Sequence, residues 1–164
     1  MTSTLPNVTH EHHERMMTRV DQLPAIADML LTAPPEELHP RLDEVDELLT
    51  GMLLPHMEAS EANLFPELER LMQNRHSMAP MRKEHETIRR LVAEYTRLHH
   101  ALGDRRPSVG QAVALRRVMF RLYALLKIHL VEEEIYVRVI DHGVAPEAAE
   151  VLAAAMDHPV ALHV

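Results

Sequence analysis

Four histidines occur where a helical pattern places them among apolar side chains. They are His13, His56, His85 and His129, out of 13 histidines in a chain of 164 residues. Apolar residues follow both His13 and His85 at offsets of 3, 7 and 10, which is the spacing of one helix face. A buried imidazole costs free energy unless both of its ring nitrogens have partners. A metal ion shared by these histidines would be such a partner, so the pattern indicates a metal site.

A carboxylate accompanies the last of these histidines. Glu133 follows His129 by four residues, which on a helix separates two side chains by about 40° around the axis and about 6 Å along it. Helical phase turns Glu133 inward and leaves Glu132 and Glu134 outside or at the flank. Bundles with di-iron sites use inward histidines and carboxylates from facing helices. Such ligands suit iron, manganese or zinc, and the spacing alone does not choose among them.

Composition excludes several other classes of protein. The absence of cysteine rules out disulfide scaffolds, iron–sulfur clusters, cysteine-ligated zinc and thiol nucleophiles. A net charge of −8 argues against nucleic acid as the main partner. No apolar run reaches membrane-spanning length, and the first residues lack the pattern of a secretion signal. We therefore expect a cytoplasmic protein whose partner is neither a nucleic acid nor a membrane.

The fold class predicted from the composition is all-α. There are 4 glycines and only 3% aromatic residues, so Leu, Met, Ala and Val must fill the core, which favours helices over strands. Prolines and glycines divide the chain into four long helical segments, with bends at Pro24, Pro55 and Pro66. A capping box at 108–111 opens the last of them, and a short fifth helix is expected from Pro146 to Met156.

These segments predict a single domain over residues 1–164. Short connections suggest an antiparallel up-down-up-down four-helix bundle over about 9–141, followed by a C-terminal extension over 142–164. The pattern also repeats, since His56 lies 43 residues after His13 and His129 lies 44 after His85. Each half is therefore a helix with one histidine followed by a helix with a histidine and an acid.

Four sequence pieces extend this pattern in a specific order. They are His13, then His56-Met-Glu-Ala-Ser-Glu61 with Leu64-Phe65-Pro66 after it, then Glu84-His85, then His129-Leu-Val-Glu-Glu133-Glu134. Over roughly residues 9–141 the chain thus resembles the hemerythrin-like, or HHE cation-binding, family. The resemblance implies a four-helix bundle with a non-haem di-iron centre, two iron ions per chain, that binds oxygen, nitric oxide or peroxide, or senses or stores iron. It also implies that His13, His56, His85 and His129 are metal ligands and that Glu133 is a bridging carboxylate.

Ser60 departs from the family pattern. It stands four residues after His56, where the family has its first bridging glutamate. Glu61 is our first candidate to replace it, although Glu61 lies about 140° around an ideal helix from His56. A solvent anion or one of the tyrosines could fill the gap instead. Otherwise the site would hold one metal ion, a weakly bound pair or none.

Further alternatives stay open from the sequence. His10 or His12 could be the ligand from the first helix in place of His13, and the other histidines are interpreted as structural or solvated. The pair Arg89-Arg90 is interpreted as ordinary solvated charge. Enzymatic turnover is undecided, since the only phenols that could donate a proton are those of the tyrosines at 95, 123 and 136.

Two other functions compete with small-ligand binding. One is a regulatory or interaction module in which a weakened metal site sets the stability of the bundle, for which Ser60 is the supporting feature. The other is a metal-free bundle that forms a homodimer through the short fifth helix.

Overall fold

The described part of the chain consists of helices joined by short turns, and it contains no strand. The computed structural model describes residues 5–143, and side chains over residues 10–138. The first segment contains α1 (Leu5–Val20) and α2 (Leu23–Met29). The second contains α3 (Pro35–Asp46), η1 (Glu47–Leu53), α4 (Leu54–Ala59), η2 (Ser60–Leu64) and α5 (Phe65–Leu71). The third is α6 (Ala79–His100), and the fourth is α7 (Val109–Gly143).

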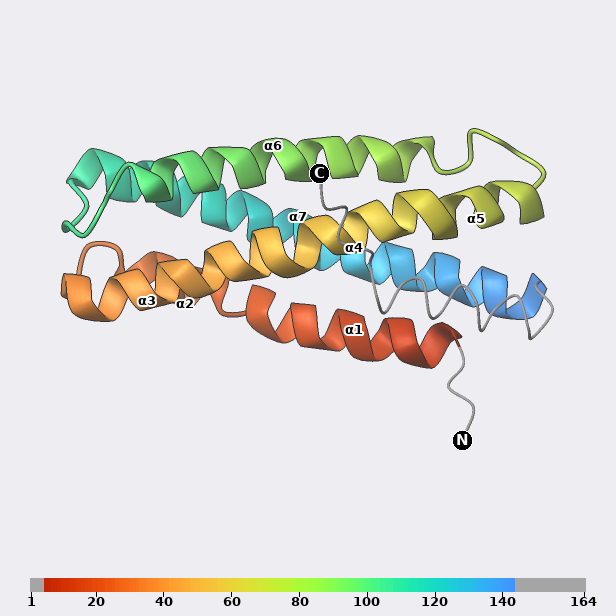
Figure 1. The fold of residues 1–164 in the computed structure, drawn as a ribbon, viewed down its shortest axis with the longest axis horizontal. Helices are drawn as coiled ribbons and strands as arrows, with labels where there is room; N and C mark the ends of the chain where they lie inside the picture. The colour runs from red at the N-terminus through yellow and green to blue at the C-terminus, as the bar shows by residue number, and fades with distance from the viewer. Residues whose placement is uncertain (1–4, 144–164) are drawn as a thin grey trace.

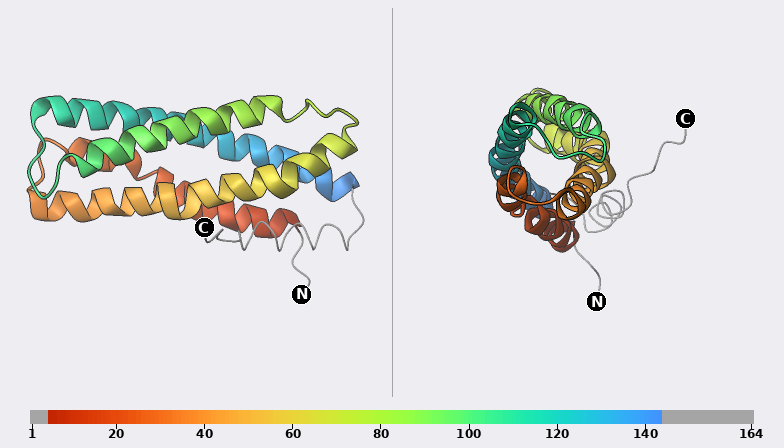
Figure 2. Two further views of the ribbon diagram at one scale, coloured as in Figure 1. Left: turned by 45° about the horizontal axis from the view of Figure 1, so that its top comes forward. Right: turned by 90° about the vertical axis from the view of Figure 1, so that its left-hand side faces the viewer.

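These segments lie side by side along one long axis (Figures 1 and 2). α7 contacts α1, α2, α5 and α6, and α3 contacts both α2 and α6. The architecture is thus a helical bundle, as the all-α expectation requires. The expected fifth helix lies outside the described residues. Between residues 5 and 143, no helix is both long and apolar enough to cross a membrane.

Prolines shape the backbone of the first two segments. A turn at residues 21–22 separates α1 from α2, with Pro24 in the first turn of α2. At Pro55 and Pro66 the chain stays helical, but the preceding turns widen into the π-helices η1 and η2. Because a proline ring clashes with the carbonyl group four residues earlier, a wider turn accommodates it without ending the helix.

The start of α7 follows the capping box expected from the sequence. The backbone N–H of Gln111 donates to the hydroxyl oxygen of Ser108, at 3.3 Å, and the backbone N–H of Ser108 donates to the side-chain oxygen of Gln111, at 3.0 Å. Before it, Gly103 adopts a positive φ of 54° in the turn that follows α6. These local signals set where α6 ends and α7 begins.

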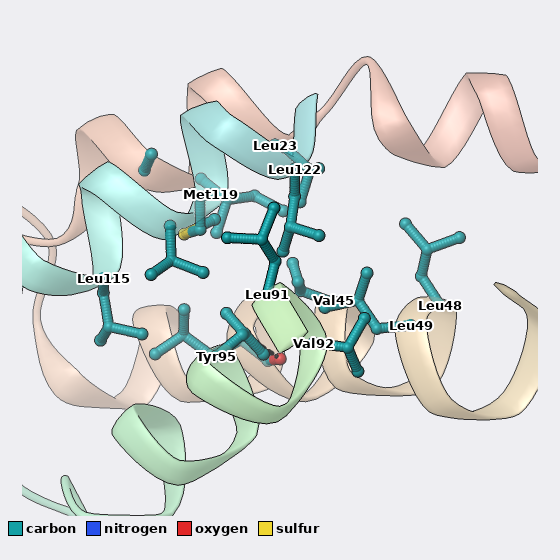
Figure 3. Packing of buried hydrophobic residues seen from close by; sticks show 14 of the residues in the cluster. Leu23, Val45, Leu48, Leu49, Leu91, Val92, Tyr95, Leu115, Met119 and Leu122 are labelled. Carbon is teal, nitrogen blue, oxygen red and sulfur yellow. Dashed lines mark hydrogen bonds between the residues drawn. The ribbon is translucent and has the colours of Figure 1, made fainter. Parts of the chain in front are cut away.

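Two separate apolar clusters form the core. The larger joins α1, α2, α3, η1, α6 and the first two thirds of α7, and Figure 3 shows its packing around Leu91, Tyr95, Met119 and Leu122. The smaller joins α5, the start of α6 and the end of α7, around Phe65. Each fully buried large apolar side chain contributes about 1.5–3 kcal/mol. The layer between the two clusters is polar.

Candidate metal centre

Five polar side chains meet in the layer between the two apolar clusters. His13 comes from α1, His56 from α4, His85 from α6, and His129 and Glu133 from α7. None of the five is more than 3% exposed. Each segment of the bundle therefore supplies one histidine to a single buried place.

Glu133 lies at the centre of this group. Its Oε2 atom is 2.7 Å from Nε2 of His56, 3.4 Å from Nε2 of His13 and 3.9 Å from Nε2 of His129. Its other oxygen, Oε1, is buried without a hydrogen-bond partner in the described structure. His13, His56 and Glu133 offer ligand atoms that all lie within 4.8 Å of one another. A buried acceptor without a partner is costly, so Oε1 is available to bind a cation.

The other two histidines face each other. Nε2 of His85 lies 3.1 Å from Nε2 of His129. Their outer nitrogens contact carboxylates, with Nδ1 of His85 2.7 Å from Glu61 and Nδ1 of His129 3.1 Å from Glu84. An ionised carboxylate only accepts hydrogen bonds, so both Nδ1 atoms are the donors. In their neutral forms the two rings then point lone pairs at each other, which a cation bound to both would relieve.

The size of the group fits metal coordination. Bonds from zinc to nitrogen or oxygen ligands are about 2.0–2.2 Å long, so neighbouring ligand atoms on one such ion lie about 3 Å apart. The separations of 3.1 Å between His85 and His129, and of 2.7 and 3.4 Å from Glu133 to His56 and His13, are of this size. The donors are nitrogen and oxygen only, which suits iron, manganese or zinc.

For three of these side chains, the surroundings favour the protonation states that bind metal. Burial lowers the pKa of His13 below its ordinary value, against the opposing effect of Glu133. Burial, with His129 alongside, lowers the pKa of His85 to about 4. For Glu133, burial opposes ionisation, but His56 and His13 hold its pKa well below the ordinary value. Neutral imidazoles and an ionised carboxylate are the forms that act as ligands.

Glu61 lies outside the buried group, and not in the inner position beside His56 that was first expected for it. It lies behind His85 and contacts the outer nitrogen of that ring, and it also accepts a hydrogen bond from Arg89 at 2.9 Å. Ser60 is the fully buried residue at this level, and its hydroxyl oxygen has no hydrogen-bond partner in the described structure. Ser60 faces inward because the helix is regular from His56 to Ser60, so Ser60 lies one ordinary turn after His56 on the same face. The widened turn begins only at Ser60.

Of the other histidines that the sequence offered, His10 lies outside the group and His12 lies beside it. His10 is exposed and pairs with Glu134 at 3.0 Å, whereas His13 lies next to Glu133. The ring of His12 packs against the ring of His56, with centroids 5.1 Å apart. Tyr95 follows His85 by 10 residues and Tyr123 precedes Glu133 by 10 residues, which on a helix is nearly three turns in each case. Tyr136 packs against the smaller cluster.

Two contacts of the site were not predicted from the sequence. Glu84 was part of a recognised motif, but its contact with His129 on the neighbouring helix was not foreseen. Arg89 was interpreted as solvated charge, yet it is bonded to Glu61. Its spacing of four residues from His85 was the available signal, because that spacing places both residues on one face of α6.

Glu84→Gln is expected to weaken metal binding by about 10–100-fold, as is typical when the outer partner of a metal-binding histidine is lost. Glu61→Gln should have the same effect through His85. Ferrous titration against a competing chelator measures the affinity. Glu86→Gln is the matched control on α6, since Glu86 pairs with Lys83 at the surface. Equal affinities of the Glu84 and Glu86 variants would contradict the role of the outer carboxylate.

The chain was also compared with known proteins. No protein-family model matches the chain, and no curated protein or solved structure matches it.

Proposed function

We propose that the chain is a hemerythrin-like metalloprotein, an antiparallel four-helix bundle that holds iron between its two apolar clusters. The ligands are the four buried histidines and Glu133, with two ions per chain as the full complement. The observation that carries this proposal is the convergence of one buried histidine from each segment on a carboxylate whose Oε1 atom has no partner. Without a cation, such a layer would be a costly interruption of the core.

The residues divide between two positions. His13, His56 and Glu133 would hold one ion, and His85 and His129 the other, with Glu133 shared by both. Glu61 and Glu84 orient the second pair of imidazoles from outside. When bound, an iron pair would supply the chemistry for binding oxygen, nitric oxide or peroxide, or for sensing or storing iron.

The surroundings favour ligand binding over turnover. Apolar clusters on both sides exclude water from the layer, and the Phe65 ring packs against that of His85, with centroids 5.2 Å apart. The buried phenol of Tyr95 donates a hydrogen bond to the carbonyl oxygen of Leu42, at 2.8 Å. Burial also raises the pKa of Tyr95, which makes it a poor proton source. Tyr95 is therefore not a proton donor to a ligand bound in this layer.

The deciding experiment is a metal count on protein purified aerobically without a histidine tag. We expect one or two iron ions per chain, measured by mass spectrometry of the metal, together with near-ultraviolet absorption from ligand-to-iron charge transfer. Manganese and zinc are measured in the same sample to establish selectivity. Absence of tightly bound metal, even after anaerobic loading with ferrous iron, would overturn the proposal.

A second candidate is a regulatory or interaction module whose weak metal site responds to iron supply. Ser60 is the observation that favours it, because the second position lacks an inner carboxylate of its own. Metal binding to the folded state raises stability by mass action, so iron availability would control how much bundle is folded. A metal affinity near the free iron level of the cell would favour this candidate, and a much tighter affinity would favour a permanently loaded site.

A further inference from the structure

α7 carries a second apolar stripe on its outward face. Its members are exposed apolar residues: Val113, Phe120, Ala124, Ile128, Val131 and Ile135. Four of them are more than half exposed, and Phe120 is 37% exposed. At 100° per residue all six fall within a sector of about 80°, and Arg117 is the one charged residue in that sector over the same stretch. Exposed apolar side chains gathered in one stripe, not scattered singly, mark an interaction surface.

The stripe is symmetric about Ala124. Val113 and Ile135 lie 11 residues before and after it, and Phe120 and Ile128 lie 4 residues before and after it. If two copies of α7 pair antiparallel around Ala124, Val113 of one copy faces Ile135 of the other, and Phe120 faces Ile128. A surface that is complementary to itself after a two-fold rotation is what a symmetric dimer requires.

The charges beside the stripe reverse along the helix. Arg116 flanks its first half and Arg117 lies within that half, whereas Glu132 and Glu134 flank its second half. Antiparallel pairing brings Arg116 and Arg117 of one copy against Glu132 of the other. Lys127 is a basic residue beside the second half, and its charge is already paired with Asp21 of the same chain at 2.8 Å. Arg117, 7 residues before Ala124, then lies next to Val131 and Glu132 of the second copy. Its aliphatic stem can cover the valine while its guanidinium reaches the glutamate. Parallel pairing would bring like charges together instead.

We propose that the occupant of this surface is a second copy of the chain, and that α7 pairs with α7 antiparallel about a two-fold axis at Ala124. The stripe between Val113 and Ile135 is about 33 Å long, which is long enough for several layers of contact. This dimer uses the described outward face of α7 and differs from the one first expected through residues 146–156. It does not depend on the metal centre.

A cysteine test fixes the register. The chain has no cysteine, so Ala124→Cys introduces the only thiol. On the two-fold axis that thiol meets its own copy, and mild oxidation of the full chain is expected to give a disulfide-linked dimer. Val113→Cys is the matched control, because antiparallel pairing holds its two copies about 33 Å apart, far beyond disulfide reach. Both variants are studied with a chelator present, so that metal-mediated association does not contribute.

Substitution tests the chemistry of the contact. Ile128→Glu should convert the dimer to a monomer in analytical ultracentrifugation, while Leu31→Glu, on an equally exposed residue off the stripe, should leave it dimeric. Arg117→Glu should raise the dimer dissociation constant at least about tenfold, and adding Glu132→Arg should restore it. Circular dichroism confirms that each variant is folded.

Three results would overturn the proposal. The first is a monomeric wild-type protein at high micromolar concentration. The second is cross-linking of Val113→Cys as efficient as that of Ala124→Cys, which would indicate parallel pairing. The third is an Ile128→Glu variant that remains a dimer of wild-type affinity.

Discussion

Glu133→Gln is expected to abolish metal binding while leaving the helices intact. Glutamine keeps the size of the side chain, but it removes the negative charge and one of the two acceptor oxygens at the centre of the group. Four neutral imidazoles would then face the cations without any compensating inner charge. The loss of affinity should exceed the roughly 100-fold effect of removing an outer partner of a ligand. Metal per chain and ferrous affinity both measure it.

The matched control is Glu132→Gln. Glu132 precedes Glu133 on the same helix but lies outside the buried group, so its substitution removes the same charge from nearly the same place. This variant should keep the wild-type metal content. Retention of wild-type iron by a folded Glu133→Gln protein would show that the cluster is not the metal site.

Ser60→Glu is expected to change stability in opposite directions with and without iron. Without metal, the added carboxylate is buried among side chains that cannot solvate it, and an unpaired buried charge costs several kcal/mol. With iron, the same carboxylate supplies the inner ligand that the second position lacks, so ferrous affinity should rise. The thermal midpoint should therefore fall in chelator and rise more steeply than that of the wild type as ferrous iron is added.

Ser60→Gln distinguishes the effect of the added negative charge from the effect of the added side-chain volume. It adds nearly the same volume at the same buried position without the negative charge, so it should lower the midpoint with no gain in iron affinity. If Ser60→Glu instead folds with the affinity and metal count of the wild type, Ser60 does not face the metal. In that case the weakness of the second position has another origin.

The sequence was sufficient for the elements and for the core of the site. Apolar periodicity predicted the four helical segments, and the capping box at Ser108 is present as expected. Helical phase chose His13 over His10 and Glu133 over its two neighbours, and the structure buries both chosen residues. These successes share a cause, because one helix face determines burial wherever the helix is regular.

The outer contacts of the site could not be predicted in the same way. Contacts from Glu61 and Arg89 depend on how α6 and the second segment face each other, which no single-helix pattern contains. The widened turn that begins at Ser60 is a second cause. A π-turn changes the angle between residues on its two sides, so phases counted at 100° per residue no longer apply across it.

The polar layer also sets the register of the helices. Leu and Met cores tolerate sliding of one helix against another, because one apolar side chain can replace another of similar volume. Sliding any segment here by one turn, about 5.4 Å, would move its histidine out of the layer and into an apolar cluster. An imidazole without partners there costs about 1–3 kcal/mol. The polar layer proposed as the metal site thus also selects one alignment of the four segments over its neighbours.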